Sequence, residues 1–488
     1  MMSMRLKPRP WQIVAVCLSF LCGCPSSPAT KPSTNVQPFR GQEVNLVVPA
    51  SLQLPAIWEV TLQEWMSQTG ATIRWSEYSE SEPGSLEKLI STPAEAGGRV
   101  ILFPLRQLSQ LDRHLAPITA DRTTIDLKDL FKGLRDRVVS RNRTPVAIPI
   151  SAPVLLCYYR ADLLAAAGLK PPETWDEYQS LLDSLDRWAP GLAAVEPLAP
   201  KHRATLFFAR SLAFAKHPEN YSVWFDLDSG KPVLQSAGFE DAIAFANRAW
   251  SKMPSSIANL TPEACRIQVL EGKAALAIGV EPTIGADRVT RADSIEIGVC
   301  RLPGSRRVFN PNSNRWDLLP DSAVHAPAIC AFDGLAISVG ASDADAGSAA
   351  AWHLLSMLVG DQFESNWAEL PKSPCRESQT STATSWNESG LTVEEASQSV
   401  DATAQMLRDS QLVADLPLPD ADSYRAATER LIGKLLFKEV DPPTALRLLQ
   451  AEFEQIAQNA AAGPLRDNYR RGLGLPKLES STSAPVAP

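Results

Sequence analysis

Residues 144–178 form the most informative run of the chain, TPVAIPISAPVLLCYYRADLLAAAGLKPPETWDEY. An extended, proline-containing segment is followed by an apolar strand, a short helix that Gly168 closes, and a Pro-Pro turn. Thr174 is a predicted helix N-cap, and Glu177 stands three residues later, which completes a capping box at the start of another helix. The run therefore predicts a strand, a helix, a turn and a second helix in succession.

The chain before this run alternates between short strands and helices. Apolar residues recur at helical spacing between Pro55 and Gln68, and Gly70 follows as a natural stop. The other expected elements are strands over 44–48, 71–75 and 99–104 and helices over 85–90 and 107–115. Alternation of this kind predicts an α/β fold with a mostly parallel sheet.

On these residues the chain resembles the extracytoplasmic (periplasmic) solute-binding proteins of ABC importers, of the family 1, sugar-binding type. Weaker matches follow in the family's order at 270–279, 297–304, 333–338, 349–358 and 442–456, so the resemblance spans about residues 43–460. The run 144–178 matches the family's hallmark at Pro149, Tyr158, Tyr159, Asp162, Leu163, Ala167, Gly168, Pro171, Pro172, Thr174, Trp175, Asp176 and Glu177.

The chain departs from the family pattern at one point that concerns the ligand. Many members carry a tryptophan on the ligand side just after the segment that matches 270–279. This chain has Gly279-Val-Glu-Pro282 there. The sugar-stacking tryptophan of the family is therefore not carried over to this sequence.

The resemblance implies an α/β fold with two lobes, the type II periplasmic-binding-protein fold. Each lobe would be a mostly parallel sheet flanked by helices, and the chain would cross between the lobes near 150–153, near 331–334 and within 378–397. The expected division is a lipoprotein signal peptide over 1–23, a Pro/Ser-rich tether over 24–42, lobe 1 over 43–151 plus about 334–390, lobe 2 over 152–333 plus about 391–465, and a tail over 466–488.

The N-terminus has the pattern of an export signal. Three basic residues precede an apolar stretch from Trp11 to Leu21, which is too short to span a bilayer core. The following Leu-Cys-Gly-Cys24 resembles a bacterial lipobox, which implies that Cys24 is the lipidated mature N-terminus. The alternatives are an ordinary signal peptide and an uncleaved anchor. Residues 1–23 carry three positive charges and no negative ones, so their removal lowers the net charge from −8 to −11.

Composition and motifs exclude several classes of function. The chain is 44% hydrophobic and 21% charged, as globular proteins are, and its net charge gives no basic surface for nucleic acid. The five histidines have no metal-ligand spacing, so neither a metal nor another cofactor is expected. The sequence has no HExxH, GxSxG or P-loop motif, and we expect a binding protein rather than an enzyme.

Five cysteines follow Cys24, and an odd number cannot form a complete disulfide framework. They include no CxxC pair, which argues against a zinc site. Cys157 and Cys330 lie in apolar runs, so we expect them to be small core residues.

A cleft that holds a polyol uses aromatic faces against C–H patches and polar side chains for the hydroxyl groups. Trp58, Trp224 and Tyr424 are the aromatic candidates, and we expect at least one of them to be exposed in the cleft. The alternative for each is a packing role in a lobe core. The polar and crossing candidates are more numerous, with scaffold roles as their alternative, and Glu281 or Asp333 is expected to reach the same space. They follow strands or lie at the expected crossings and are Ser51, Arg106, Ser151, Glu281, Phe332 and Asp333.

The sequence therefore predicts a lipid-anchored extracytoplasmic protein that captures a small solute, expected to be a sugar or oligosaccharide, between two closing lobes. Its partners would be the solute, the permease subunits of an ABC transporter, and the membrane through the N-terminal lipid. The alternatives are a lipoprotein of the same fold that acts as a sensor or scaffold, a binder of a non-sugar solute, and an envelope hydrolase.

Overall fold

The computed structural model describes residues 37–80, 82, 84–91, 98–280, 291–330, 334–341, 349–360, 363, 367, 373–381, 390–459 and 464–478. The expected signal peptide, most of the tether and the end of the tail lie outside these ranges. So do four candidate residues, which are Cys24, Glu281, Phe332 and Asp333. In the described part of the chain, no helix combines the length and the apolarity needed to cross a bilayer.

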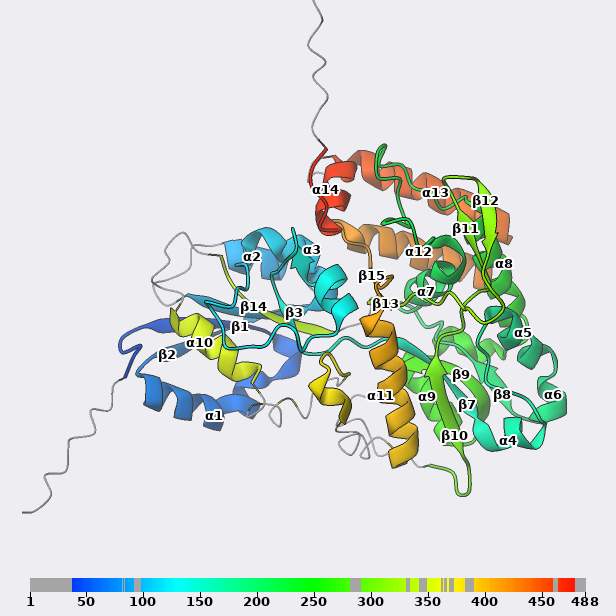
Figure 1. The fold of residues 1–488 in the computed structure, drawn as a ribbon, viewed down its shortest axis with the longest axis horizontal. Helices are drawn as coiled ribbons and strands as arrows, with labels where there is room; N and C mark the ends of the chain where they lie inside the picture. The colour runs from blue at the N-terminus through cyan, green and yellow to red at the C-terminus, as the bar shows by residue number, and fades with distance from the viewer. Residues whose placement is uncertain are drawn as a thin grey trace, which may run out of the picture. The chain divides into compact units, whose positions relative to one another are not determined.

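The first sheet has five strands in the order β2-β1-β3-β14-β6 (Figure 1). Strand β1 runs parallel to β2 and β3, whereas β14 runs antiparallel to β3 and β6. The strands are β1 (Glu43–Pro49), β2 (Thr72–Tyr78), β3 (Arg99–Pro104), β6 (Ile148–Pro149) and β14 (Leu335–Val339). The three strands expected before residue 105 are confirmed, and β2 continues three residues beyond its predicted end.

Helices cover both faces of this sheet, and the alternation of side chains along β1 separates the two faces. Val44, Leu46 and Val48 share a core with α1 (Leu54–Thr69) and α10 (Ala349–Leu358), whereas Val47 shares a core with α2 (Ser85–Ser91) and α3 (Leu108–Leu111). The helix expected over 107–115 is shorter than predicted. Two 3-10 turns, Leu105–Gln107 and Asp112–His114, flank α3.

The second sheet has four strands in the order β10-β7-β9-β8. They are β7 (Leu155–Arg160), β8 (Ala193–Val195), β9 (Ala274–Val280) and β10 (Ile297–Arg301). The expectation of a mostly parallel sheet is wrong here, because β7 runs antiparallel to both of its neighbours. The physical reason is the chain path. Strand β7 arrives from the other sheet at the edge where β9 ends, as the pairing of Leu155 with Val280 shows.

Ten helices of the described chain follow β7 in the sequence, apart from α10, which packs on the first sheet. The capping box expected before α5 is present, because the Glu177 amide donates to Thr174 Oγ1 over 3.2 Å and the Thr174 amide donates to Glu177 Oε2 over 3.1 Å. The helices are α4 (Ala161–Ala166), α5 (Trp175–Asp183), α6 (Leu185–Trp188), α7 (Arg203–Ala215), α8 (Ala237–Trp250), α9 (Pro262–Leu270), α11 (Val393–Arg408), α12 (Ala421–Leu436), α13 (Pro442–Asn459) and α14 (Leu465–Gly472).

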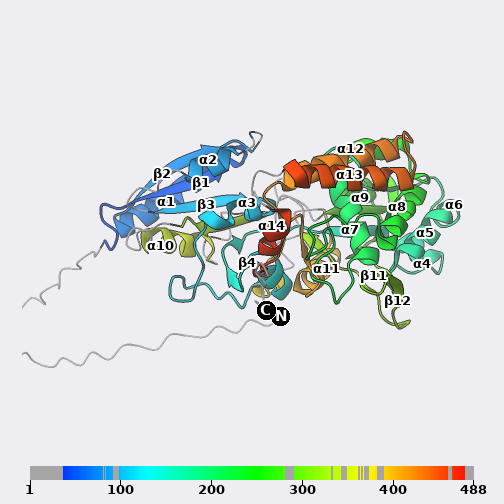
Figure 2. The same ribbon diagram turned by 90° about the horizontal axis from the view of Figure 1, so that it is seen from above.

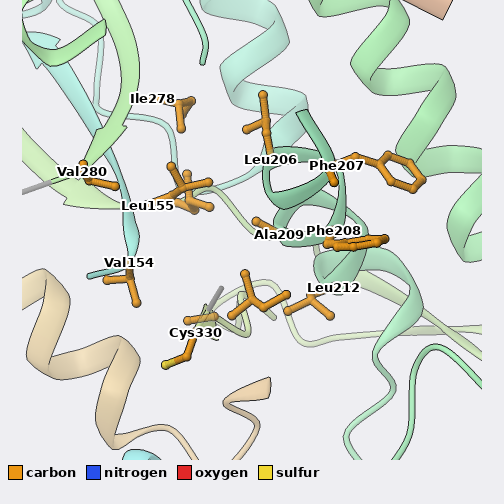
Figure 3. Packing of buried hydrophobic residues seen from close by; sticks show 14 of the residues in the cluster. Val154, Leu155, Leu206, Phe207, Phe208, Ala209, Leu212, Ile278, Val280 and Cys330 are labelled. Atoms are coloured by element: carbon orange, nitrogen blue, oxygen red, sulfur yellow. The ribbon is translucent and has the colours of Figure 1, made fainter. Parts of the chain in front are cut away.

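Helices α12 and α13 run side by side and pack against α7 and α8 (Figures 1 and 2). Helix α9 packs on β9, and α11 packs on β10. Between α7 and the strands β7 and β9, apolar side chains such as Leu155, Leu206 and Ile278 fill the interior (Figure 3). Shorter pairs complete the structure: β4 (Ser140–Arg141) with β5 (Thr144–Pro145), β11 (Arg307–Asn310) with β12 (Arg315–Leu318), and β13 (Ile329–Cys330) with β15 (Val413–Ala414).

The segment that connects the two sheets after β6 lies beside the start of β14, as predicted. Residues 150–154 lead from β6 to β7, whereas the expected crossing near 331–334 lies outside the described residues except for Gly334, which directly precedes β14. The Ile150 amide donates to the Leu335 carbonyl over 2.7 Å, and the Leu335 amide donates to Ser151 Oγ over 3.0 Å. A side chain on Gly334 would place its Cβ 2.4 Å from the Ser151 carbonyl oxygen, so only glycine allows this close approach.

Candidate functional site

The carboxyl ends of β1, β2 and β3 lie at one edge of the first sheet, because these strands are parallel and Pro49 is paired with Tyr78. Open α/β sheets bind ligands outside the carboxyl ends of their strands. A polar or charged residue follows each of the three strand ends by two positions. These residues are Ser51, Glu80 and Arg106, and together they define the candidate edge.

Hydrogen bonding and electrostatics show that residues of the candidate edge lie close together. The Ser51 amide donates to Glu80 Oε2 over 3.4 Å. The Tyr78 hydroxyl donates to the Leu102 carbonyl over 3.2 Å, and burial raises the pKa of Tyr78 far above its usual value. The Glu80 carboxylate raises this pKa further and the Arg106 guanidinium opposes it, so both charges act on the same hydroxyl.

The candidate edge offers both signs of charge on accessible side chains. Ser51 and Glu80 are exposed and Arg106 is half-buried. A carboxylate accepts hydrogen bonds from hydroxyl groups, whereas a guanidinium donates to them. The arrangement is therefore suited to a ligand that carries several hydroxyl groups.

The backbone around the candidate edge is tightly turned. Residues Ala50–Leu52 form a 3-10 turn between β1 and α1, and Gln53 caps α1 in a left-handed conformation with φ of 50°. Non-glycine residues rarely adopt this conformation, and functional sites are enriched in such positions. After β3, the Leu105 amide donates to the Gly334 carbonyl over 2.7 Å. The candidate edge is therefore bonded directly to Gly334, which precedes β14 and packs against Ser151 of the segment that connects the two sheets.

The expectation that Trp58, Trp224 or Tyr424 is exposed is wrong, because all three are fully buried. Trp58 makes T-shaped contacts with Phe363 and Trp367, with ring centroids 5.1 and 4.7 Å apart. It belongs to the core between the first sheet and its helices. Its position on the inward face of α1 explains the burial, since a large aromatic side chain gains most from removal of its surface from water.

The two aromatic candidates of the second sheet's helical layer also serve packing. The Trp224 ring lies 4.6 Å from the Phe208 ring, and its Nε1 donates to the Asp415 carbonyl over 3.2 Å. Tyr424 packs edge-on against Phe453 at 4.8 Å. Both belong to the same apolar core. None of the three predicted aromatics offers a surface on which a ligand can stack.

Ser151 is a structural residue rather than an accessible contact, which corrects its prediction as a site residue. It is fully buried, and its hydroxyl accepts the Leu335 amide proton where the connecting segment meets the start of β14. Glu281, Phe332 and Asp333 lie outside the described residues. Ser51 and Arg106 are the predicted residues that the structure brings together, and Tyr78 and Glu80 were missed because β2 was expected to end at residue 75.

A cavity of about 940 Å³ lies elsewhere, on the face of the first sheet that α1 and α10 cover. It is lined by the second half of α1, by α10 and by residues 120–124, and the Trp65 Nε1 donates to His353 Nδ1 over 3.0 Å at its wall. Because α1 returns across the sheet, its second half lies toward the amino ends of the parallel strands, away from the candidate edge. Among the described residues, no group of three or more His, Cys, Asp or Glu side chains could hold a metal ion.

No family model matches the sequence, and no curated protein matches it either. Solved structures do match. The maltose-bound MalE3 of T. maritima is 17% identical, with a TM-score of 0.58 over 85% of this chain and 99% of that one. The sugar-binding protein MalE of Xanthomonas citri is 18% identical, with a TM-score of 0.59 over 86% and 98%. The fold is the two-lobed, type II periplasmic-binding fold.

Polyol-bound proteins share this fold as well. A solute-binding protein of an ABC transporter from Agrobacterium vitis S4, solved with bound D-mannitol, is 16% identical, with a TM-score of 0.57 over 86% of this chain and 99% of that one. These relatives are binding proteins. At such low identity the likeness establishes the architecture, and the ligand of this chain is a separate question.

Proposed function

We propose that the protein is an extracytoplasmic solute-binding protein of an ABC importer, anchored to the cell envelope by lipid on Cys24. The observation that carries the solute-binding part of this proposal is the match of about 85% of the chain to nearly complete sugar- and polyol-binding proteins. The anchoring part rests on the sequence that ends at Cys24. The proposed lobes are residues 43–151 with about 334–390 and residues 152–333 with about 391–465. The proposed receiver of the solute is the transporter's permease.

The proposed ligand is a carbohydrate or polyol bound at the candidate edge. Ser51, Glu80 and Arg106 supply acceptors and donors there, and hydrogen bonds to charged groups contribute about 1.5–3 kcal/mol each. The buried Trp58, Trp224 and Tyr424 supply no stacking surface, so we assign the polar groups the larger share of the affinity. A ligand that contacts both lobes only when they are closed shifts the population toward the closed state.

A thermal-shift screen of the purified protein against sugars, polyols, amino acids and polyamines tests this assignment. A ligand present at about 100 times its Kd should stabilise the protein by about 2.7 kcal/mol. We expect a sugar or polyol to give such a shift. Stabilisation only by solutes of another class would contradict the carbohydrate assignment.

Titration calorimetry with the ligand found in the screen then tests the site. Arg106→Ala should weaken binding by about tenfold or more, because it removes hydrogen bonds to a charged group. Arg74→Ala is the matched control, since Arg74 lies earlier on β2 and pairs with Glu43 over 3.3 Å. Equal affinities of the two variants would place the ligand elsewhere.

A further inference from the structure

The second sheet sets two cysteines directly opposite each other. Strands β7 and β10 are antiparallel neighbours, and their register pairs Cys157 with Cys300. Among the strand pairings of the described residues, no other register places two cysteines together. The remaining described cysteines lie on α9, on β13 opposite Ala414, and in the segment before residue 376.

The hydrogen-bond pattern of β10 defines the spacing of this pair. The Ile297 amide donates to Glu395 Oε1 over 2.9 Å, and the Val299 amide donates to Gln398 Oε1 over 3.0 Å. Both acceptors belong to α11, so these two residues direct their amides away from β7. Along a strand, the backbone amides point alternately to one side and to the other. The Cys300 amide therefore points toward β7, and Cys300 exchanges backbone hydrogen bonds with Cys157. The Cα atoms of such a pair lie about 5.5 Å apart, a separation that disulfides span.

The two side chains leave the sheet on the same face, because directly opposed residues of a pair do so. A hydrogen bond with the Cys300 side chain, together with burial, raises the pKa of the Cys157 thiol. Both cysteines are free thiols in this structure, and the register and this interaction both place them on one face of the sheet. On the same face, Tyr159 lies over Gly298, where an added Cβ would come within 2.1 Å of the ring.

The exposure of the pair is unequal. Cys157 is fully buried, as its apolar surroundings predicted, whereas Cys300 is only partly buried. Cys300 is therefore the sulfur that a reagent from solution reaches first. A thiolate is the attacking species in thiol–disulfide exchange.

We propose that Cys157 and Cys300 form a disulfide that crosslinks β7 and β10 in the exported protein. This inference rests on the export that the proposed function requires, because disulfides persist in oxidising compartments. The oxidant is a disulfide-bearing protein or small molecule. The Cys300 thiolate attacks one of its sulfurs and expels the other as a thiolate. Cys157 then loses its proton, attacks the Cys300 sulfur and expels the second thiolate, so two thiols are oxidised and one disulfide is reduced.

The test is performed on the full chain, expressed with its N-terminal segment in a bacterium. Cells are quenched in acid, the protein is denatured and alkylated without reduction, and peptides are mapped by mass spectrometry. We expect Cys157 and Cys300 to escape alkylation and to appear in one crosslinked peptide pair, lighter by two hydrogen atoms than the two thiol peptides. Cys265 and Cys330 should be alkylated in the same sample and serve as internal controls.

Two variants and one treatment make the result decisive. In Cys300→Ala the Cys157 thiol should become fully alkylated, whereas Cys265→Ala should keep the crosslink. Purified reduced protein is also treated with glutathione disulfide, which tests the pairing without export. Failure of the crosslink in both settings, or pairing of either cysteine with a different one, overturns the proposal. A crosslink formed with glutathione disulfide but missing in cells would leave the pairing intact and contradict the export.

Discussion

Replacement of Arg210 by methionine should destabilise the helical layer on the second sheet by about 3–5 kcal/mol. Arg210 Nη2 lies 2.6 Å from Glu196 Oε1, and both side chains are fully buried. The Trp250 Nε1 donates to the other Glu196 oxygen over 2.8 Å, and the guanidinium lies 4.3 Å from the Trp175 ring centroid. Methionine keeps most of the volume but leaves the Glu196 carboxylate buried without its counter-charge, which is the origin of the large effect.

Equilibrium unfolding in urea, followed by tryptophan fluorescence and by amide hydrogen exchange in α7, measures the loss. The double variant Glu196→Gln with Arg210→Met should recover more than half of the lost stability, because neither side chain of the pair is then charged. Arg74→Met is the control. It breaks the exposed pair with Glu43 and should change the free energy of unfolding by less than about 1 kcal/mol. A loss below about 1 kcal/mol for Arg210→Met, or a double variant that is no better than the single one, would refute this reasoning.

Three further predictions concern pH, backbone packing and the anchor. Burial lowers the pKa of His325 from 6.5 to about 4, and its Nε2 donates to the Lys216 carbonyl. As the pH falls, the unfolded chain therefore takes up the proton before the folded protein does. Up to about 3 kcal/mol of stability, fully present above pH 6.5, should be lost as the pH falls toward 4. In an acid-unfolding experiment, His325→Gln should flatten this part of the curve. Gly334→Ala forces a Cβ against the Ser151 carbonyl and should lower the unfolding free energy in urea by about 1–3 kcal/mol; an unchanged midpoint would contradict the close approach. Cys24→Ser should release the protein from the membrane fraction or block its processing, whereas unchanged retention on fractionation would count against lipidation.

Local sequence patterns were sufficient for the existence and the ends of several elements. The capping box at Thr174 and Glu177 and the left-handed stop at Gly70 act within a few residues, so they are visible without the fold. The connecting segment near 150–153 was implied by the family resemblance of the run 144–178. The return strand near residue 333 followed from the same resemblance, and hydrogen bonds confirm that residues 150–151 lie beside the start of β14.

Local sequence patterns could not predict which aromatic residues are buried. A tryptophan after a strand has the same local pattern whether it faces a ligand or a core. For Trp58 the outcome depends on Phe363 and Trp367, which lie about 300 residues away in the chain. The antiparallel direction of β7 likewise could not be read from its own residues, because it depends on the chain arriving from the first sheet.

Proximity across strands is the other property that needs the assembled sheet. Glu80 joins Ser51 and Arg106 because β1, β2 and β3 are parallel and end at one edge, and Cys157 meets Cys300 because β10 pairs with β7 in one register. A shift of one residue in that register would turn the side chains to opposite faces. Short-range patterns thus specify each strand. The register between strands arises only when strands distant in sequence bury their apolar faces together, and the register decides which side chains become neighbours.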